Sequence, residues 1–304
     1  MNNPSSMLAL QRLYHWEATS PQRVCFTQPV GQGVVKTFTW AEVIHEVRCM
    51  ASHLQSLNCP SGSRIAIWGK NTAHWIMADW AIWMAGHVSV PLYPTLATKT
   101  VRKILEHSGA CLLFVGKLDD ADAMRAGIPE QLPCISLPLG PQWAGAQWSD
   151  IVGEQAPLQG QPVRPAEDLC TVMYTSGTTG NPKGVMHSFG TFQAIIAQGL
   201  KRIPLNQNDR MLSYLPLSHI AERGLVEHML LATGMQVFFA ESQETFAKDM
   251  QRARPTFFFS VPRLWLKFRE GVHGKMAPKK LEFLLKIPVI SSLVRKKNID
   301  CARS

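Results

Sequence analysis

One short segment, residues 171–184, restricts the fold and the function of this chain more than any other. It reads TVMYTSGTTGNPKG: an apolar run, Thr171–Tyr174, leads into six small residues, and Lys183 follows three positions later. Glycines remove the side chains that would block close approach, so such a loop can bring backbone N–H groups, hydroxyls and one ammonium group against a polyanion. The segment predicts a phosphate-binding loop; the alternative interpretation is a Ser/Thr/Gly-rich surface turn after a strand.

Two common phosphate loops do not match this segment. The P-loop of nucleotide triphosphatases requires a glycine before the lysine and a hydroxyl after it, whereas Lys183 stands between Pro182 and Gly184. The dinucleotide fingerprint G-x-G-x-x-G is absent as well, because the next glycines after Gly177 are Gly180 and Gly184. The stretch 174–184 instead resembles the signature loop of the adenylate-forming superfamily, Y-T-S-G-T-T-G-x-P-K-G, which it matches throughout. That superfamily contains acyl-CoA synthetases, luciferases and the adenylation domains of peptide synthetases.

A second segment, residues 211–224 (MLSYLPLSHIAERG), carries three functional side chains close together: His219, Glu222 and Arg223. A histidine at the end of a strand is commonly a hydrogen-bonded structural residue, and that interpretation stays open here. The form L-P-L-x-H-x-x-E-R resembles the long-chain fatty acyl-CoA synthetases. The tetrapeptide SVPR, residues 260–263, which precedes an apolar stretch, also resembles the sequences of the long-chain synthetases. The resemblance extends from about Thr37 onward.

The resemblance implies an AMP-forming acyl-CoA ligase, in which a fatty-acid carboxylate is adenylated by MgATP and then transferred to CoA. Preorganised N–H donors and cations stabilise the charge that builds on the phosphate oxygens. The implied cofactors are ATP, Mg²⁺ and CoA, and the metal ligand is not identified. Lys183, His219 and Glu222 are the implied catalytic residues, with His219 bordering the acyl site and Glu222 helping to orient it. The implied phosphate-binding residues are Thr175, Ser176, Gly177, Thr178, Thr179, Gly180 and Lys183.

The rest of the chain alternates as an α/β protein does. Apolar periodicity predicts helices over 39–57, 74–85 and 98–108, and strands over 64–68, 88–93, 111–116, 169–174 and 234–240. The helix over 74–85 is apolar on most sides, which favours a core helix over an aromatic binding face. Residues 137–165, rich in Gly, Pro and Gln, are expected to be a surface connection, and a helix is expected to begin near Ser188, directly after the phosphate loop.

The predicted fold class is α/β, with layered sheets and helices as in the N-terminal large domain of the adenylate-forming superfamily. Residues 37–168 are expected to form a first α/β portion, and residues 169–304 a second one that contains the phosphate loop. The superfamily's Y-G-x-T-E segment has no counterpart here. We therefore expect a truncated AMP-binding region, incomplete at its C-terminus and without the lid domain and its catalytic lysine, and we expect it not to make acyl-CoA alone. A non-catalytic nucleotide- or acyl-binding fragment is the alternative.

Charge is concentrated in the last part of the chain. The formal net charge is +9, and residues 263–304 hold eleven Lys/Arg against three Asp/Glu. Within them, residues 279–297 place basic residues on both sides of an apolar run. Such a segment can lie on an anionic membrane or attract acyl chains and CoA. A solvated helix pair is an equally favoured interpretation of the segment. For the protein as a whole, a membrane-associated interaction module is a further functional alternative. No apolar run is long enough to span a membrane, and no signal peptide or C-x-x-C pair occurs. The prediction is a cytoplasmic protein with peripheral membrane contact and no nucleic-acid partner.

Overall fold

The computed structural model describes residues 7–143, 145–176 and 182–275. The chain divides into two compact units, one up to Arg254 and a second from Pro255 onward. In the first unit the strands are β1 Val24–Gly31, β2 Val34–Thr39, β3 Arg64–Trp68, β4 Val88–Leu92, β5 Leu112–Val115, β6 Cys134–Ser136, β7 Ala146–Gln147, β8 Leu169–Ser176, β9 Pro182–Ser188, β10 Arg210–Ser213 and β11 Gln236–Phe239.

The helices of the first unit are α1 Ala9–Thr19, α2 Trp40–Ser56, α3 Ala73–Met84, α4 Thr98–Ser108, α5 Ala121–Met124, η2 Arg125–Gly127, α6 Trp148–Glu154, α7 Phe189–Arg202, α8 Ile220–Glu222, the π-helix η3 Arg223–His228, α9 Met229–Thr233 and α10 Phe246–Ala253. The second unit contains α11, Pro262–Lys275. The helices that the structure describes all lack the length and apolar character needed to cross a bilayer.

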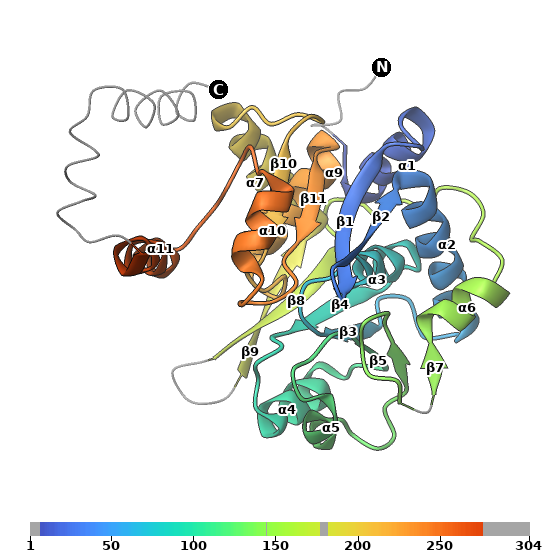
Figure 1. The fold of residues 1–304 in the computed structure, drawn as a ribbon. Helices are drawn as coiled ribbons and strands as arrows, with labels where there is room; N and C mark the ends of the chain where they lie inside the picture. The colour runs from blue at the N-terminus through green and yellow to red at the C-terminus, as the bar shows by residue number, and fades with distance from the viewer. Residues whose placement is uncertain (1–6, 144, 177–181, 276–304) are drawn as a thin grey trace. The chain divides into compact units, whose positions relative to one another are not determined.

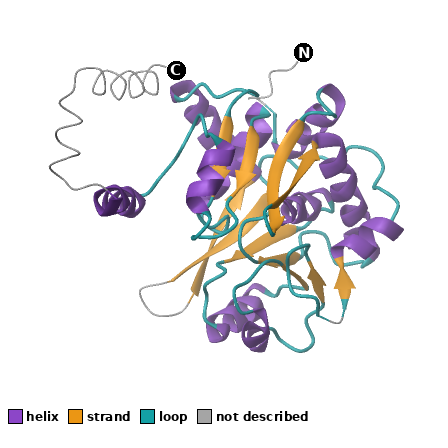
Figure 2. Cartoon of the chain, in the orientation of Figure 1, coloured by secondary structure: helices purple, strands orange, loops and turns teal. Residues whose placement is uncertain are grey.

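Two mostly parallel sheets form the first unit (Figure 1). The larger has the order β7-β6-β5-β3-β4-β8-β9, and β9 is its antiparallel edge strand. The smaller has the order β10-β11-β1-β2, in which β2 is the antiparallel edge strand. Helices lie in most of the connections between the parallel strands, whereas β6 and β7 are joined without one. The α/β class and its layers of sheets and helices are therefore confirmed (Figure 2).

Helix α3 lies in the core between the two sheets. All twelve of its residues are buried, including three tryptophans. Trp80 stacks on Phe26 of β1, with ring centroids 5.8 Å apart, and the Trp83 indole donates to the Cys170 carbonyl of β8 at 3.0 Å. Because α3 contacts a strand of each sheet, its apolar side chains are buried on all sides. The prediction that residues 74–85 form a core helix is therefore confirmed.

Local sequence signals place several element ends. Helix α2 begins after Thr39, whose side chain accepts from the Glu42 N–H while Glu42 accepts from the Thr39 N–H, a reciprocal capping box. Helix α4 ends at Gly109 with φ of 63°, a left-handed conformation that glycine adopts without strain. The ranges predicted for β3 and α4 agree with the structure at both ends.

Two expectations about the positions of elements are wrong, and the fold also uses residues that precede the predicted start of the resemblance. Residues 137–165 are not only a surface connection, because they include α6, whose Trp148 is 1% exposed. The residues before 37 provide α1 and most of the β1–β2 hairpin, which starts the smaller sheet. The phosphate loop does not lead directly into a helix: Ser188 does cap α7, but β9 intervenes.

Candidate functional site

The described residues of the phosphate segment belong to two paired strands, the end of β8 and the start of β9 (Figure 1). Strands β8 and β9 pair antiparallel, which places Thr175 opposite Lys183 and Ser176 opposite Pro182. Thr175 and Lys183 are both exposed, and no described residue forms an ion pair with the Lys183 ammonium group. Gly177, Thr178, Thr179 and Gly180 lie outside the described residues. The structure therefore brings together one hydroxyl and one cation from the two sides of the predicted loop.

Gly184, the last residue of the signature, has a packing role in this hairpin. It pairs with Tyr174, and a Cβ atom added at Gly184 would lie 2.8 Å from the Val172 Cγ1 atom and 3.2 Å from the Tyr174 ring. The Tyr174 hydroxyl in turn contacts the His107 Nδ1 atom of α4 at 2.7 Å. Side chains of β8 and α4 thus fix the hairpin below Thr175 and Lys183, and only a glycine fits there without displacement.

Glu222, from the second segment, is a buried anchor for the turn that follows β10. Its Oε1 atom accepts from the Ser213 hydroxyl and from the Tyr214 N–H, both at 2.9 Å. Burial raises the pKa of Glu222 to about 8, against the lowering effect of these hydrogen bonds. We expected Glu222 to orient His219; its described hydrogen-bond partners are Ser213, Tyr214 and the more distant Asn71 instead.

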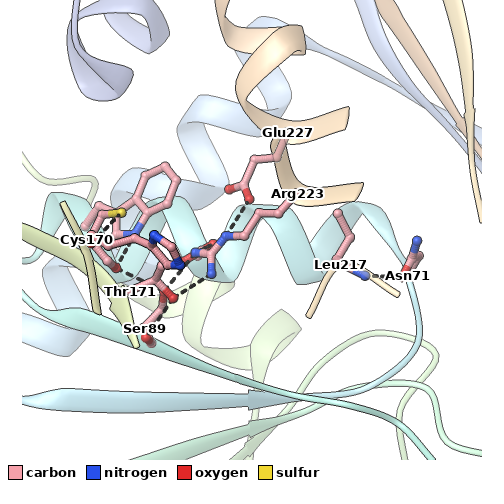
Figure 3. A network of polar contacts seen from close by, with 10 residues as sticks. Asn71, Ser89, Cys170, Thr171, Leu217, Arg223 and Glu227 are labelled. Atoms are coloured by element: carbon pink, nitrogen blue, oxygen red, sulfur yellow. Dashed lines mark hydrogen bonds and ion pairs between the residues drawn. The ribbon is translucent and has the colours of Figure 1, made fainter. Parts of the chain in front are cut away.

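Asn71, directly after β3, completes this anchor. Its Nδ2 donates to the Ser213 hydroxyl at 2.8 Å and to the Leu215 carbonyl at 2.5 Å, and its Oδ1 accepts from the Leu217 N–H at 3.0 Å (Figure 3). One amide side chain therefore fixes both ends of the L-P-L turn. Asn71 is not predicted from the sequence, because no local signal shows that it would contact residues about 145 positions later.

His219 lies at the exposed N-terminus of the short helix α8. Its Nδ1 atom accepts from the Ala221 N–H at 3.2 Å. An Nδ1 atom that accepts a hydrogen bond leaves the proton of the neutral ring on Nε2. His219 is thus held by a hydrogen bond within its own helix, which agrees with the structural interpretation, and its role in a site stays a prediction.

Arg223, next to Glu222, connects the two segments through the core (Figure 3). Its guanidinium donates to the Thr171 hydroxyl of β8 at 2.6 Å and to the Ser89 hydroxyl of β4 at 2.9 Å. It also pairs with Asp79 of α3 and, at 3.1 Å, with Glu227 in the π-helix. All three charged side chains are fully buried. Arg223 therefore links the strand that leads to Thr175 with the helix that follows His219.

The charges in this cluster balance through protonation. Burial and the charge of Asp79 raise the pKa of Glu227 well above its ordinary value, and burial raises the pKa of Asp79 as well, so the two coupled carboxyl groups favour sharing one proton. One cation is then matched by one anion, as a desolvated site requires. The guanidinium also lies 5.7 and 5.6 Å from the rings of Trp75 and Trp83. Asp79, a single acid within an otherwise apolar helical pattern, was the signal that could have revealed this cluster.

The residues present fit a polyphosphate better than a resident metal. The hairpin offers the Lys183 ammonium and the Thr175 hydroxyl, both exposed. Within the described ranges, no group of three or more His, Cys, Asp or Glu side chains is arranged to hold a metal ion. The ligand of a nucleotide-bound Mg²⁺ therefore stays unassigned.

Comparison with known proteins identifies the family. The profile of the AMP-binding enzyme family matches residues 13–295. The chain therefore belongs to the AMP-binding enzyme family. The fold and the two segments place it in the adenylate-forming class expected from the sequence.

Three curated relatives that match this chain are named as acyl-CoA synthetases or long-chain fatty acid–CoA ligases. The chain is 31% identical to fatty acyl-CoA synthetase A of Dictyostelium discoideum over 79% of this chain and 38% of that protein. It is also 31% identical to the peroxisomal long chain acyl-CoA synthetase 6 of Arabidopsis thaliana, over 79% of this chain and 36% of the relative. The long-chain-fatty-acid–CoA ligase FadD15 of Mycobacterium tuberculosis is 29% identical over 84% and 44%, respectively. The chain thus spans less than half the length of these relatives.

Experimental structures agree on the fold. The anthranilate CoA ligase AuaEII in complex with anthranoyl-AMP superposes with a TM-score of 0.73 at 21% identity, over 86% of this chain and 52% of that one. The O-succinylbenzoate coenzyme A synthetase of Bacillus subtilis in complex with AMP gives 0.68 at 23% identity, over 86% and 64%. At this identity the likeness concerns the fold alone.

Proposed function

We propose that this chain provides the ATP phosphate-binding part of an AMP-forming ligase that activates a fatty acid and transfers it to CoA. The observation that carries the proposal is the exposed pair Thr175 and Lys183. These residues lie opposite each other on β8 and β9, and the preceding residues of β8 are buried. A cation and a hydroxyl placed opposite each other on paired strands can contact the β- and γ-phosphates of ATP together. Membership of the AMP-binding family and the names of the relatives support it.

In the proposed reaction, a fatty-acid carboxylate oxygen attacks the α-phosphorus of ATP and the bond to the β-phosphate oxygen breaks, releasing pyrophosphate. The CoA thiol then attacks the acyl carbonyl and AMP leaves. Lys183 and the hydroxyl of Thr175 hold the departing phosphates, together with the other residues of the signature. Mg²⁺, when bound to ATP, neutralises phosphate charge. His219 borders the acyl site and donates from Nε2, whereas Glu222 and Arg223 hold the surrounding backbone.

Binding of ATP tests the first part of this proposal. Calorimetric titration of the 304-residue chain with MgATP should show saturable binding, and tripolyphosphate should compete with it because the phosphates supply most of the contacts. Absence of ATP binding would contradict the proposal. Pyrophosphate release with ATP and palmitate separates a ligase from a fragment that only binds nucleotide.

The long-chain preference is a finer proposal, supported by the L-P-L-x-H-x-x-E-R form and by relatives named for long-chain substrates. It is tested by the acyl chain length that gives the largest ATP-dependent pyrophosphate release. Greater release with acetate or benzoate than with palmitate would contradict it.

We also propose that residues 279–297 make the protein a peripheral binder of anionic membranes. This segment lies outside the described residues, and the support is the charge excess of residues 263–304, eleven basic against three acidic. Each Lys or Arg near an anionic surface contributes roughly 1 kcal/mol, and salt screens it. Sedimentation with phosphatidylglycerol vesicles should therefore occur at low salt and decrease at high salt. Lack of pelleting, or pelleting indifferent to salt, would contradict this.

A further inference from the structure

A cavity lies away from both signature segments. It has a volume of about 260 Å³ and is lined by the β1–β2 hairpin, α2, α3, α6 and the loop after β6. None of its lining residues belongs to residues 171–184 or 211–224. The side chains that decide its chemistry are Lys36, Phe38, Glu46, His74 and Trp148. Its volume admits a small molecule of a few heavy atoms, not a nucleotide or an acyl chain.

An ionised carboxylate lies at the base of this cavity. The Glu46 Oε2 atom accepts from the Trp148 Nε1–H at 2.8 Å and contacts the His74 Nε2 atom at 3.2 Å. Burial favours the neutral acid, but the hydrogen bond and the charge of His74, the hydrogen bond from Trp148 and the charge of Lys36 together outweigh it, so the pKa of Glu46 is lowered. The side chain keeps 18% exposure, and Oε1 has no hydrogen-bond partner among the residues described. Glu46 thus presents an anionic oxygen to the cavity.

Aromatic rings surround this carboxylate. His74 meets Phe38 edge-on with centroids 5.4 Å apart, and it meets Trp148 in the same manner at 5.6 Å. Phe38, His74 and Trp148 are all buried, so the rings are fixed. Aromatic faces together with a carboxylate attract ammonium groups, because the ring quadrupole and the negative charge act in the same direction.

The chain itself already places an ammonium group against this wall. The Lys36 Nζ atom lies 4.4 Å from the Phe38 ring centroid. Lys36 is exposed on β2, which is an edge strand, so its side chain can move away without disturbing the core. The site is therefore suited to an ammonium group and is screened by a lysine that an outside ligand can displace.

We propose that this cavity binds a small organic ammonium ion, which contacts the Glu46 carboxylate and the rings of Phe38 and Trp148 in place of the Lys36 ammonium. The ligand class follows from the charge of the base and the aromatic walls. A free amine and the ammonium headgroup of a lipid share this chemistry. The proposal is independent of the adenylation function, because it uses none of the residues assigned to it.

Titration with tetramethylammonium chloride tests the proposal, with sodium chloride at equal ionic strength as the blank. The indole N–H signal of Trp148 in ¹H–¹⁵N NMR spectra reports locally, since that N–H donates to Glu46; it is assigned by its loss in Trp148→Phe. We expect a saturable shift. Lys36→Met should tighten binding about threefold by removing the competing ammonium, and Glu46→Gln should weaken it about tenfold or more.

Gln at position 46 can still accept the Trp148 hydrogen bond, so persistence of the indole signal shows that the variant is folded. Lys201→Met and Glu130→Gln, both at exposed positions, serve as matched controls and should leave the affinity unchanged. Cosedimentation with phosphatidylcholine vesicles that Glu46→Gln abolishes would assign the ammonium to a lipid headgroup. If neither tetramethylammonium nor these vesicles bind, or if Glu46→Gln binds as the wild type does, the proposal is wrong.

Discussion

Arg223 and Lys183 are basic residues from the two signature segments, and the structure places them in opposite environments. Arg223 is fully buried and bonded to two carboxyl groups and two hydroxyls from four different elements. Lys183 is exposed near the end of a hairpin, with no described ion-pair partner. The comparison shows that a signature contains two kinds of residue: those that hold the strands together and those that are left available for a ligand.

The largest effect on stability is expected when the buried ion pairs of Arg223 are removed. Arg223→Met leaves the Asp79 and Glu227 carboxyl groups buried without their cation, which should lower the free energy of unfolding by about 3–5 kcal/mol. The triple variant Arg223→Met/Asp79→Leu/Glu227→Met removes all the charges and should recover most of that loss. Urea unfolding measures both. A triple variant less stable than the single one would contradict the balanced-charge account; Arg202→Met at the exposed end of α7 is the control.

Glu222, the buried neighbour of Arg223, should make the free energy of unfolding depend on pH. Its pKa in the folded state is raised to about 8 by burial, so the folded protein holds a proton that the unfolded chain releases near its ordinary pKa. The stability from Glu222 is therefore present at low pH and is lost as the pH rises through the raised pKa. Relative to Glu222→Gln, the wild type should lose about 1.4 kcal/mol per pH unit, or about 3 kcal/mol from about pH 5 to about pH 7.

Urea unfolding of the wild type and Glu222→Gln across this pH range measures the difference, and contributions from other titrating groups cancel. Parallel stability curves would show that Glu222 is not held in its protonated form.

A smaller effect is expected from the single bond that joins Arg223 to the hairpin strand. Thr171→Val keeps the shape of the side chain but removes the hydroxyl, which accepts from the guanidinium at 2.6 Å and also donates to the Ser89 carbonyl at 3.1 Å. We expect a loss of about 1–2 kcal/mol in the free energy of unfolding. Ser108→Ala, whose hydroxyl donates to the Leu105 carbonyl within α4, should cost less. Equal losses in the two variants would mean that the hydrogen bond between Arg223 and β8 stabilises the fold no more than a hydrogen bond within one helix.

The sequence predicted the elements whose signals are local. The short apolar run of β3 and the amphipathic pattern of α4, ended by Gly109, were sufficient to locate both ends. Strand β9 was missed because its first residues, Pro182, Lys183 and Gly184, have low strand propensity, and pairing with β8 overrides that preference.

In the candidate site, the signature letters predicted which residues matter but not what each one contacts. Glu222 and Arg223 were singled out by their spacing from His219, yet several of their partners, Asn71 before α3 and residues of α3, β4 and β8, lie far away in the chain. Such partners depend on the sheet order and on the position of α3, which no local pattern contains. The exposure of Lys183, by contrast, follows from its place after a small-residue loop.

The most direct test of the central claim is to measure ATP affinity and stability together in Lys183→Ala. If Lys183 is available for phosphate and does not support the fold, the variant should lose about 1.5–3 kcal/mol of ATP-binding free energy, roughly tenfold to a hundredfold in affinity. Its free energy of unfolding without ATP should stay within about 0.5 kcal/mol of the wild type. Lys201→Ala, on α7, should change neither quantity. Unchanged ATP affinity in Lys183→Ala, or a loss of stability in its place, would contradict the account.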